Sequence, residues 1–286
     1  MIRLDGKPVV EAHQKKLTAW LDTMKNQGLN IQMGILLVGN DRSAQMYLFF
    51  MEKKAKQAGL GVVKVQLPET ATQKEVEEAI ETMNQDDSIY GVLPLMPMPK
   101  QIDEAAAIAC LRPDKDLDGL TTTNVGLVSS GKGGFAPCTP RACLAILDYY
   151  KIPLDGKHVV VVGRSPVVGR PVALMALARN ATVTICHSHT TNMKELLLDA
   201  DVVIAAVGKP HLIDGTMIKP GAVVIDVGIN ELDGKTVGDV DYESIAQVAG
   251  ALTPVPGGVG TVTTTMMLEG VYDAYHARNV DSTEHC

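Results

Sequence analysis

The chain lacks any long uninterrupted apolar run, and this absence excludes a membrane-spanning helix. Such a helix needs about 20 consecutive, mainly apolar residues, whereas the 46% hydrophobic residues of this 286-residue chain fall in shorter stretches. The opening MIRLDGKPVVEAHQ carries charges where a secretory signal peptide would be apolar. We therefore expect a cytoplasmic protein that has no membrane partner.

Cysteines are few, and their spacing matches neither a disulfide framework nor a zinc site. The five are Cys110, Cys138, Cys143, Cys186 and Cys286. We expect reduced thiols and no bound metal. Asp114, Asp116 and Asp118 resemble the start of a calcium loop, but Val125 stands where that loop needs a bidentate Glu. Basic residues are not in excess either, because the net charge is -7, so nucleic acid is not an expected partner.

Helical and strand patterns alternate along the chain, which is typical of an α/β protein with parallel sheets. In the first half the sequence predicts helices near 8–28, 43–57, 73–83 and 103–109, and strands at 31–38, 62–65 and 91–96. In the second half it predicts a helix over 141–150 and apolar strands at 158–163, 182–186, 202–207 and 223–227. The second series is Rossmann-like.

A segment rich in Gly, Thr, Pro and Asp separates the two halves. It runs from Pro113 to Pro140 and has little apolar periodicity, so we interpret it as a loop-bearing junction between two lobes. The last residues, Asp281–Cys286, are expected to form a frayed tail.

The strand at 158–163 ends in a glycine turn, Gly163–Pro171, and a helix through Ala178 is predicted to follow. A helix that begins after such a turn offers free backbone N–H groups and a positive dipole end to a phosphate. Gly163 and Gly169 are spaced G-x5-G, so the turn alone is a weak fingerprint for a dinucleotide. The alternative is a strand-to-helix turn that binds no nucleotide.

The end of the next strand favours NADP over NAD. An NAD-selective site usually places Asp or Glu there to bind the ribose hydroxyls, but this chain has Cys186-His-Ser-His-Thr190. Arg164 and Ser188 could instead receive a 2′-phosphate. His187 and His189 could equally be ordinary loop histidines.

Several motifs in a fixed order resemble the bifunctional methylenetetrahydrofolate dehydrogenase/cyclohydrolase family. In the second half they are Gly163–Pro171, Val183–Ser188, Val224–Asn230 and Thr253–Gly260. In the first half they are Val38–Asp41, Tyr47, Gly91–Leu93, Pro97–Pro99, Lys115–Gly119 and Pro137–Pro140. Each motif alone could occur by chance, but their joint order and spacing are specific.

The resemblance implies a homodimer of two-lobed α/β subunits. A parallel-sheet, folate-binding catalytic domain would span 1–120 with a C-terminal helix at about 262–278, and a Rossmann-like NAD(P)-binding domain would span 121–261. NADP would contact Gly163, Arg164, Ser165, Gly169, Ser188 and Ile229. Tetrahydrofolate derivatives would contact Tyr47, Leu95, Asp118, Pro256 and Gly257, with Tyr47 stacking on the ring system and Asp118 bonding the pterin as the catalytic residues. From residue chemistry alone, Tyr47 could be a half-buried helix aromatic.

Two positions depart from the pattern of family members that have cyclohydrolase activity. Members with that activity typically carry a Tyr-x-x-x-Lys motif, whose two side chains lie one helical turn apart. In this chain Met51 stands four residues after Tyr47, in place of the lysine. The glutamine that normally supports the lysine is replaced by Leu95. Lys54, at +7, lies about 10 Å along the helix from Tyr47 and is not an obvious substitute.

The two reactions of the family differ in what they require of the protein. Hydride transfer from the methylene bridge to nicotinamide needs alignment but no acid or base, whereas hydrolysis of the methenyl product needs a titratable group. We therefore predict an NADP-dependent oxidoreductase, a methylenetetrahydrofolate dehydrogenase of one-carbon metabolism, whose cyclohydrolase activity is doubtful. The alternatives are a fully bifunctional enzyme in which Lys54 or water replaces the lysine, a non-catalytic folate- or nucleotide-binding paralogue, and a dehydrogenase for another one-carbon carrier.

Overall fold

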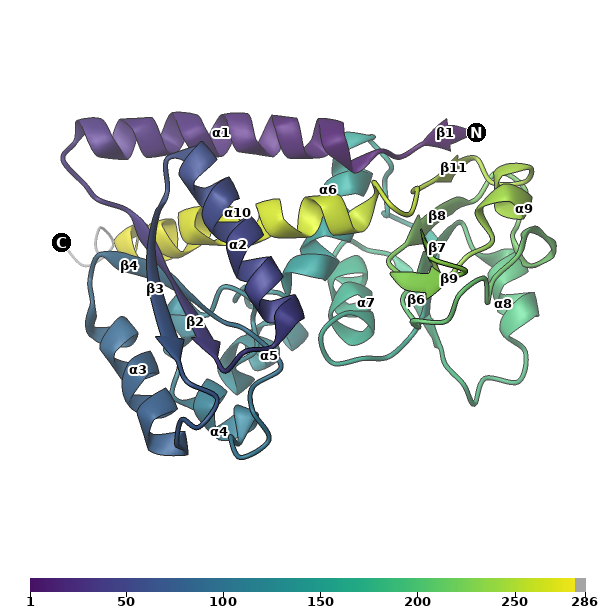
Figure 1. Ribbon diagram of the computed structural model, residues 1–286. Coiled ribbons are helices and arrows are strands. Elements are labelled where there is room, and N and C mark those ends of the chain that lie inside the picture. Colours follow the sequence, from purple (N-terminus) through teal and green to yellow (C-terminus); the bar gives the residue numbers. More distant parts are fainter. Residues whose placement is uncertain (281–286) are drawn as a thin grey trace. The chain divides into compact units, whose positions relative to one another are not determined.

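The computed structural model describes residues 1–280, so the tail predicted at Asp281–Cys286 lies outside the described residues. The chain forms two compact α/β units (Figure 1). The six-stranded unit comprises Met1–Ala12 and Pro137–Met266, and the three-stranded unit comprises His13–Ala136 and the residues from Met267 onward. Within residues 1–280, no helix is both long and apolar enough to cross a membrane. The functional assignment of 1–120, 121–261 and 262–278 stays a prediction.

The three-stranded unit is built around a parallel sheet. Strand β2 (Gln32–Val38) lies between β3 (Gly61–Leu67) and β4 (Ile89–Pro94). Its helices are α2 (Arg42–Ala58), α3 (Gln73–Gln85), α4 (Glu104–Ala109), a 3-10 turn η1 (Pro113–Lys115) and α5 (Thr122–Ser129), together with parts of α1 (Gly6–Asn26) and α10 (Val259–Val280). Helices connect successive parallel strands, as the alternating pattern predicts.

Local signals in the sequence set the limits of these elements. Asp41 caps the N-terminus of α2 by accepting the N–H of Ala44 at 2.8 Å, and Gly59 ends the helix in the left-handed conformation, with φ 85°. Side chains alternate along β2: Leu36 and Val38 enter a buried cluster with residues of α3, and α2 also packs on the sheet (Figure 1).

The six-stranded unit has the strand order β1-β11-β8-β7-β5-β6, and every neighbouring pair is parallel. Its strands are β1 (Ile2–Arg3), β5 (His158–Val162), β6 (Thr182–Cys186), β7 (Val202–Ala205), β8 (Val223–Asp226) and β11 (Ala251–Leu252), with a separate hairpin of β9 (Asn230–Leu232) and β10 (Lys235–Val237). Its helices are α6 (Cys138–Tyr149), α7 (Gly169–Leu177), α8 (Met193–Asp199), the 3-10 turn η2 (Gly215–Met217) and α9 (Tyr242–Ala246).

Strand β5 is the point at which the chain changes direction across this sheet. It pairs with β6 on one side and with β7 on the other. In open α/β sheets, ligands bind outside the carboxyl ends of the strands at such a switch point. The loops that follow β5 and β7 are therefore the expected walls of a ligand site.

The predicted junction from Pro113 to Pro140 was wrong in part, because it contains α5 and the start of α6. The α5 sequence TTNVGLVS combines β-branched residues with a glycine, so local propensity is weak. Tertiary contacts compensate: Thr121 caps the helix, and the buried Asn124 amide donates to the Pro113 carbonyl and the Asp116 carboxylate, each at 2.9 Å.

Candidate active site

The turn after β5 forms a compact backbone cradle. Gly163 has a φ of 127°, and a Cβ there would clash with the carbonyl of Ala206, so the position requires glycine. The Ser165 hydroxyl accepts the N–H groups of Val168 at 3.2 Å and Gly169 at 3.3 Å. Helix α7 then begins at Gly169. The N–H groups of Val168 and Gly169 are therefore already bonded within the turn, and the phosphate cradle stays a prediction.

A cavity of about 620 Å³ opens beside this turn. Its walls come from the segments that follow β5, β6 and β7, and from the start of α8. They are Val162, Gly163, Arg164, Ser165, His187, Ser188, Thr190, Met193, Ala206, Val207, Lys209 and Leu212. Arg164 and Lys209 supply positive charge, and none of these lining residues is acidic. The cavity therefore suits an anionic ligand.

The loop after β6 explains how the two histidines differ. The His187 N–H donates to the Thr190 hydroxyl at 2.9 Å, and the His189 N–H donates to the His187 ring at 3.2 Å. His187 is half-buried and lines the cavity with Ser188, whereas His189 is exposed and is not among the lining residues. Lys209 was not predicted from the sequence. Its position shortly after β7, beside the switch point, is the signal that could have indicated it.

A smaller cavity of about 180 Å³ lies in the same unit. It is lined by the residues after β8, including Gly228 and Ile229, and by the segment 254–261. The predicted cofactor residue Ile229, 69% exposed, therefore shares a cavity with the predicted substrate residues Pro256 and Gly257. The cofactor contact of Ile229 and the substrate contacts of Pro256 and Gly257 stay predictions.

A buried carboxylate supports this second cavity. Asp226 is 2% exposed, and it accepts the N–H of Gly228 at 2.9 Å and that of Val240 at 3.1 Å. Burial raises the pKa of Asp226 to about 6, and the neighbouring carboxylate of Asp239 adds to the rise. The Asp226 carboxylate, at the end of β8, therefore holds the backbone at Gly228, which lines the cavity, and at Val240.

In the three-stranded unit, predicted substrate residues lie near the carboxyl ends of the strands. Tyr47 lies in the second turn of α2, which follows β2, and Leu95 directly follows β4. Asp116 pairs with Val92 of β4 in a parallel bridge, so Asp118, two residues on, lies beside the end of β4. Tyr47 and Asp118 are both half-buried.

The loop that carries Asp118 is fixed by two buried charges. Lys115, with 0% exposed, donates to the carbonyls of Met83 at 2.9 Å and Asp86 at 2.7 Å. The Asp116 carboxylate accepts the N–H and the hydroxyl of Thr121, each at 2.8 Å. Asp118 is thus presented by a preorganised loop rather than by a mobile one.

The two positions predicted to depart from the family pattern are apolar and buried. Met51 is 0% exposed and Leu95 is 4% exposed, so neither offers a titratable group. Lys54, further along α2, is half-buried, and desolvation by burial lowers its pKa.

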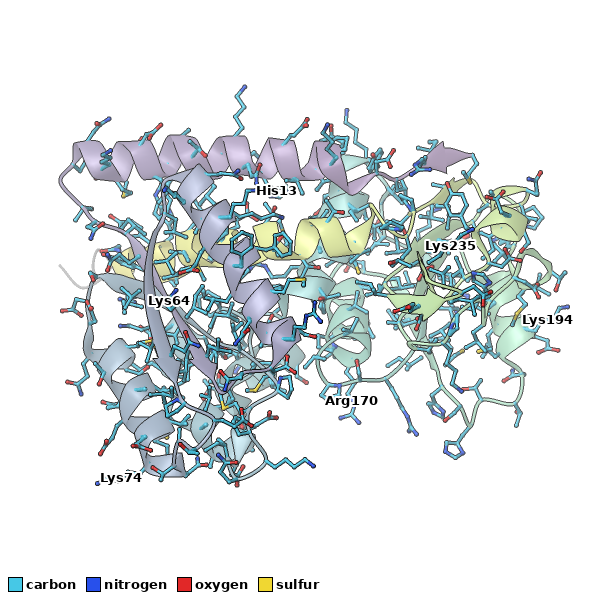
Figure 2. All side chains as sticks on the ribbon, in the orientation of Figure 1. His13, Lys64, Lys74, Arg170, Lys194 and Lys235 are labelled. Atoms are coloured by element: carbon cyan, nitrogen blue, oxygen red, sulfur yellow. The ribbon has the colours of Figure 1, made fainter. Side chains whose placement is uncertain are left out.

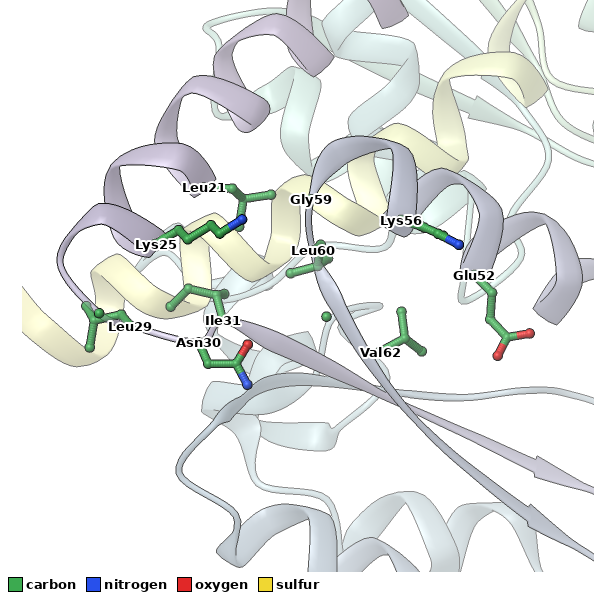
Figure 3. Close-up of a pocket in the computed structure, with 12 residues that line it drawn as sticks. Leu21, Lys25, Leu29, Asn30, Ile31, Glu52, Lys56, Gly59, Leu60 and Val62 are labelled. Atoms are coloured by element: carbon green, nitrogen blue, oxygen red, sulfur yellow. The ribbon is translucent and has the colours of Figure 1, made fainter.

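Another cavity in the three-stranded unit, of about 700 Å³, lies away from the predicted site (Figure 3). Lys25 of α1, Glu52 and Lys56 of α2, and Ile31 and Gly61 at the starts of β2 and β3 line it. It therefore opens at the amino ends of these strands, opposite the ends where ligands usually bind. None of its described lining residues is a predicted site residue.

Comparison with known families accounts for both units. Residues 4–118 match the model described as tetrahydrofolate dehydrogenase/cyclohydrolase, catalytic domain, and residues 137–279 match that of its NAD(P)-binding domain. The chain belongs to this family. The predicted family and the predicted two-domain α/β class are thereby confirmed.

Family relatives match over nearly the whole chain. A bifunctional protein FolD from Exiguobacterium sibiricum is 42% identical over 95% of this chain and 98% of its own length. The crystal structure of a bifunctional FolD from Campylobacter jejuni matches with a TM-score of 0.94 and 37% identity, covering 97% of this chain and 99% of that one. A Trypanosoma brucei FolD, complexed with NADP cofactor and inhibitor, matches with a TM-score of 0.90 and 32% identity, covering 98% of each chain.

Family membership identifies the class of reaction and the role of each unit. The protein is an NAD(P)-linked oxidoreductase of tetrahydrofolate one-carbon metabolism. The six-stranded unit, with its glycine turn and cationic cavity, lies within the part matched by the NAD(P)-binding domain apart from Met1–Ala12. The loop that presents Asp118 lies within or next to the part matched by the FolD catalytic domain.

Proposed function

We propose that this protein transfers a hydride between 5,10-methylenetetrahydrofolate and NADP, giving 5,10-methenyltetrahydrofolate, and hydrolyses the methenyl bridge poorly. The observation that carries the proposal is the pair of buried, apolar side chains Met51 and Leu95 in a unit that otherwise keeps Tyr47 and Asp118. The cofactor cavity supports the choice of NADP, because it contains Arg164 and Lys209 and has no acidic residue among its lining residues.

The residues present fit a dinucleotide. The Gly163 turn has the tight backbone that a dinucleotide cradle needs, and the N-terminus of α7 directs the positive end of its dipole toward this turn. When bound, NADP supplies the nicotinamide ring that accepts the hydride. Arg164 and Ser188 would bind the 2′-phosphate, Ser165 and Gly169 would shape the cradle, and Ile229 would contact the nicotinamide end.

The folate side needs orientation more than proton transfer. Tyr47 would stack on the ring system, and Asp118 would accept hydrogen bonds from the pterin edge. Pro256 and Gly257 would complete the substrate contacts. Because hydride transfer leaves a resonance-stabilised cation and moves no proton, a well-aligned site suffices for this step. Hydrolysis also requires a group that takes a proton from water and gives one to the departing nitrogen, and neither Met51 nor Leu95 can do this.

A second candidate function is the fully bifunctional one. It is favoured by Lys54, which lies on the same helix as Tyr47 and whose pKa is lowered by burial, as a general base requires. The family relatives that are bifunctional also support it. The rate at which the unmodified protein hydrolyses the methenyl bridge separates the two candidates, and the Lys54→Met variant then tests whether Lys54 is the base of any such hydrolysis. A non-catalytic role has less support, since the nucleotide cradle is intact.

The test is a spectrophotometric assay of the purified protein with methylenetetrahydrofolate and each nicotinamide cofactor. Reduced cofactor and methenyl product are followed together. The proposal expects both to rise in equal amounts with NADP, and more slowly with NAD. Absence of turnover with either cofactor would favour the non-catalytic alternative. The resemblance further suggests a homodimer in the cytoplasm, and analytical ultracentrifugation tests the dimer.

A further inference from the structure

Three consecutive backbone amides converge on one buried carboxylate in the six-stranded unit. Asp239 is 0% exposed. Its Oδ2 accepts the N–H of Val207 at 2.6 Å and that of Gly208 at 3.0 Å, and its Oδ1 accepts the N–H of Lys209 at 2.8 Å. The side-chain amide of Asn230 donates to Oδ1 at 3.0 Å. Successive amides that point to one place form a nest that binds anions, and here the anion belongs to the protein.

The loop held by this carboxylate lies at the switch point of the sheet. Residues 206–209 follow β7, which pairs with β5. Val207 and Lys209 line the cofactor cavity, and Asn230 follows Ile229, which lines the smaller cavity. One buried carboxylate therefore ties together a loop from each cavity.

The surroundings of Asp239 leave little freedom to its side chain. A Cβ at Gly228 would clash with the Asp239 carboxylate, and a Cβ at Gly238 would clash with Asp226. The Asp239 N–H also donates to the Asp226 carboxylate at 3.0 Å. Because residues 206–209 belong to no helix or strand, these side-chain bonds provide order that secondary structure does not.

We propose that Asp239 is a positioning residue for the dinucleotide, which holds loop 206–209 in the shape that walls the cofactor cavity. The inference rests on the proposed function, because it assumes that NADP occupies this cavity. It also limits the contacts of the loop: because the N–H groups of Val207, Gly208 and Lys209 already donate to Asp239, the Lys209 ammonium is the donor that these three residues can offer the cofactor.

The test compares Asp239→Asn with Asp241→Asn, a control with the same charge change on the same segment. Asp241 caps α9, and asparagine is an equally good cap. In Asp239→Asn, either orientation of the new amide turns its NH₂ group toward a backbone N–H. We expect the Kd of this variant for NADP to rise about tenfold or more, while its Kd for folate does not change. The control variant should keep the NADP Kd of the unmodified protein. Adding Asn230→Asp should recover part of the affinity, because residue 239 can then donate to residue 230.

Amide hydrogen exchange supplies a readout that a general loss of stability would not produce. In Asp239→Asn, the amides of residues 207–209 should exchange about 100-fold faster while those of β5 do not change. In the unmodified, cofactor-free protein the same three amides should be protected. Exchange there at the rate of a free loop would overturn the proposal even if the variant does not fold.

The binding outcomes separate the two proposals. If the unmodified protein binds NADP and Asp239→Asn binds it equally well, the positioning role is wrong and the proposed function stands. If the unmodified protein does not bind NADP, both are wrong.

Discussion

Arg164 and Lys209 place two positive charges on the wall of the cofactor cavity, and they come from opposite sides of the switch point. A 2′-phosphate would be stabilised by charge-assisted hydrogen bonds from such groups. Ser188 can add a neutral donor. We therefore expect a few side chains on loops to decide between NADP and NAD, and the backbone turn at Gly163 to serve both cofactors.

Arg164→Ala should raise the KM for NADP by about 10- to 100-fold, which corresponds to the loss of a hydrogen bond to a charged group, and should change the KM for NAD much less. The control is Arg170→Ala, which removes an exposed arginine of α7 that is not among the cavity residues (Figure 2). Equal effects of Arg164→Ala on the two cofactors would contradict the assignment of Arg164 to the 2′-phosphate.

Asp118→Ala should weaken folate binding and turnover by about 10- to 100-fold, because hydrogen bonds to a charged acceptor are lost. NADP affinity should not change, since the cofactor cavity lies in the other unit. Isothermal titration calorimetry with each ligand measures both effects, and Asp87→Ala, an exposed acid of the same unit, is the control. An unchanged folate affinity would leave Asp118 with a purely structural role.

Lys115→Met should lower the free energy of unfolding by about 2–4 kcal/mol, because the buried carbonyls of Met83 and Asp86 lose their donor. Burial lowers the pKa of Lys115 to about 8, below its unfolded value. The unfolded chain then binds more protons between about pH 8 and 10.5, so the stability of the unmodified protein relative to the variant should rise with pH in this window. Urea unfolding at pH 7 and pH 9.5 measures it, with exposed Lys132→Met as the control. A difference that is constant with pH would contradict the lowered pKa.

At the scale of elements, one arginine makes several of the contacts that hold the end of α10 in the three-stranded unit. Arg278 of α10 donates to the carbonyls of Ile89 at 3.1 Å and Tyr90 at 3.3 Å. Its guanidinium lies 4.8 Å from the centre of the Tyr90 ring and 3.2 Å from the carboxylate of Asp114. The helix is thus tied both to β4 and to the segment that leads to Asp118.

Arg278→Ala should therefore destabilise the protein by about 2–3 kcal/mol and speed amide exchange in β4. Asn279→Ala removes the next, exposed side chain of α10 and should change stability by less than about 0.5 kcal/mol. Denaturant unfolding with exchange mass spectrometry measures both. Equal stability of the two variants would show that the contacts of Arg278 do not contribute to holding α10.

The sequence allowed the strands to be predicted more closely than the helical junction. Strand β6 has the predicted limits, and β5 differs by one residue. Strand β5 is a buried, continuous apolar run, and the edge strand β6 is rich in β-branched residues. By contrast, α5 depends on contacts of Asn124 with the Pro113 carbonyl and the Asp116 carboxylate, which no local pattern reveals.

The residues of the site were likewise predictable only where a local pattern marks them. Gly163 and Arg164 follow from a strand-to-helix turn, whereas Lys209 and Asp239 become visible only once β7 is placed beside β5.

At the scale of the whole molecule, the proposed function is a dehydrogenase that lacks efficient cyclohydrolase activity. The family fold keeps a cofactor cavity in one unit and Tyr47 and Asp118 in the other. The motif resemblance predicts that Met51 and Leu95 stand where relatives with cyclohydrolase activity carry a lysine and a glutamine. General acid–base assistance is worth about 10²–10⁴-fold in rate, so the two activities should differ by a large factor.

The decay of added methenyltetrahydrofolate absorbance, compared with dehydrogenase turnover of the same preparation, tests this central claim most directly. The account predicts an enzyme-dependent decay at least about 100-fold slower than the dehydrogenase rate. It also predicts that Met51→Lys combined with Leu95→Gln accelerates the decay more than either change alone, because a buried ammonium needs a polar partner. Decay by the unmodified protein at a rate comparable to its dehydrogenase turnover would contradict the account and establish the bifunctional enzyme in its place.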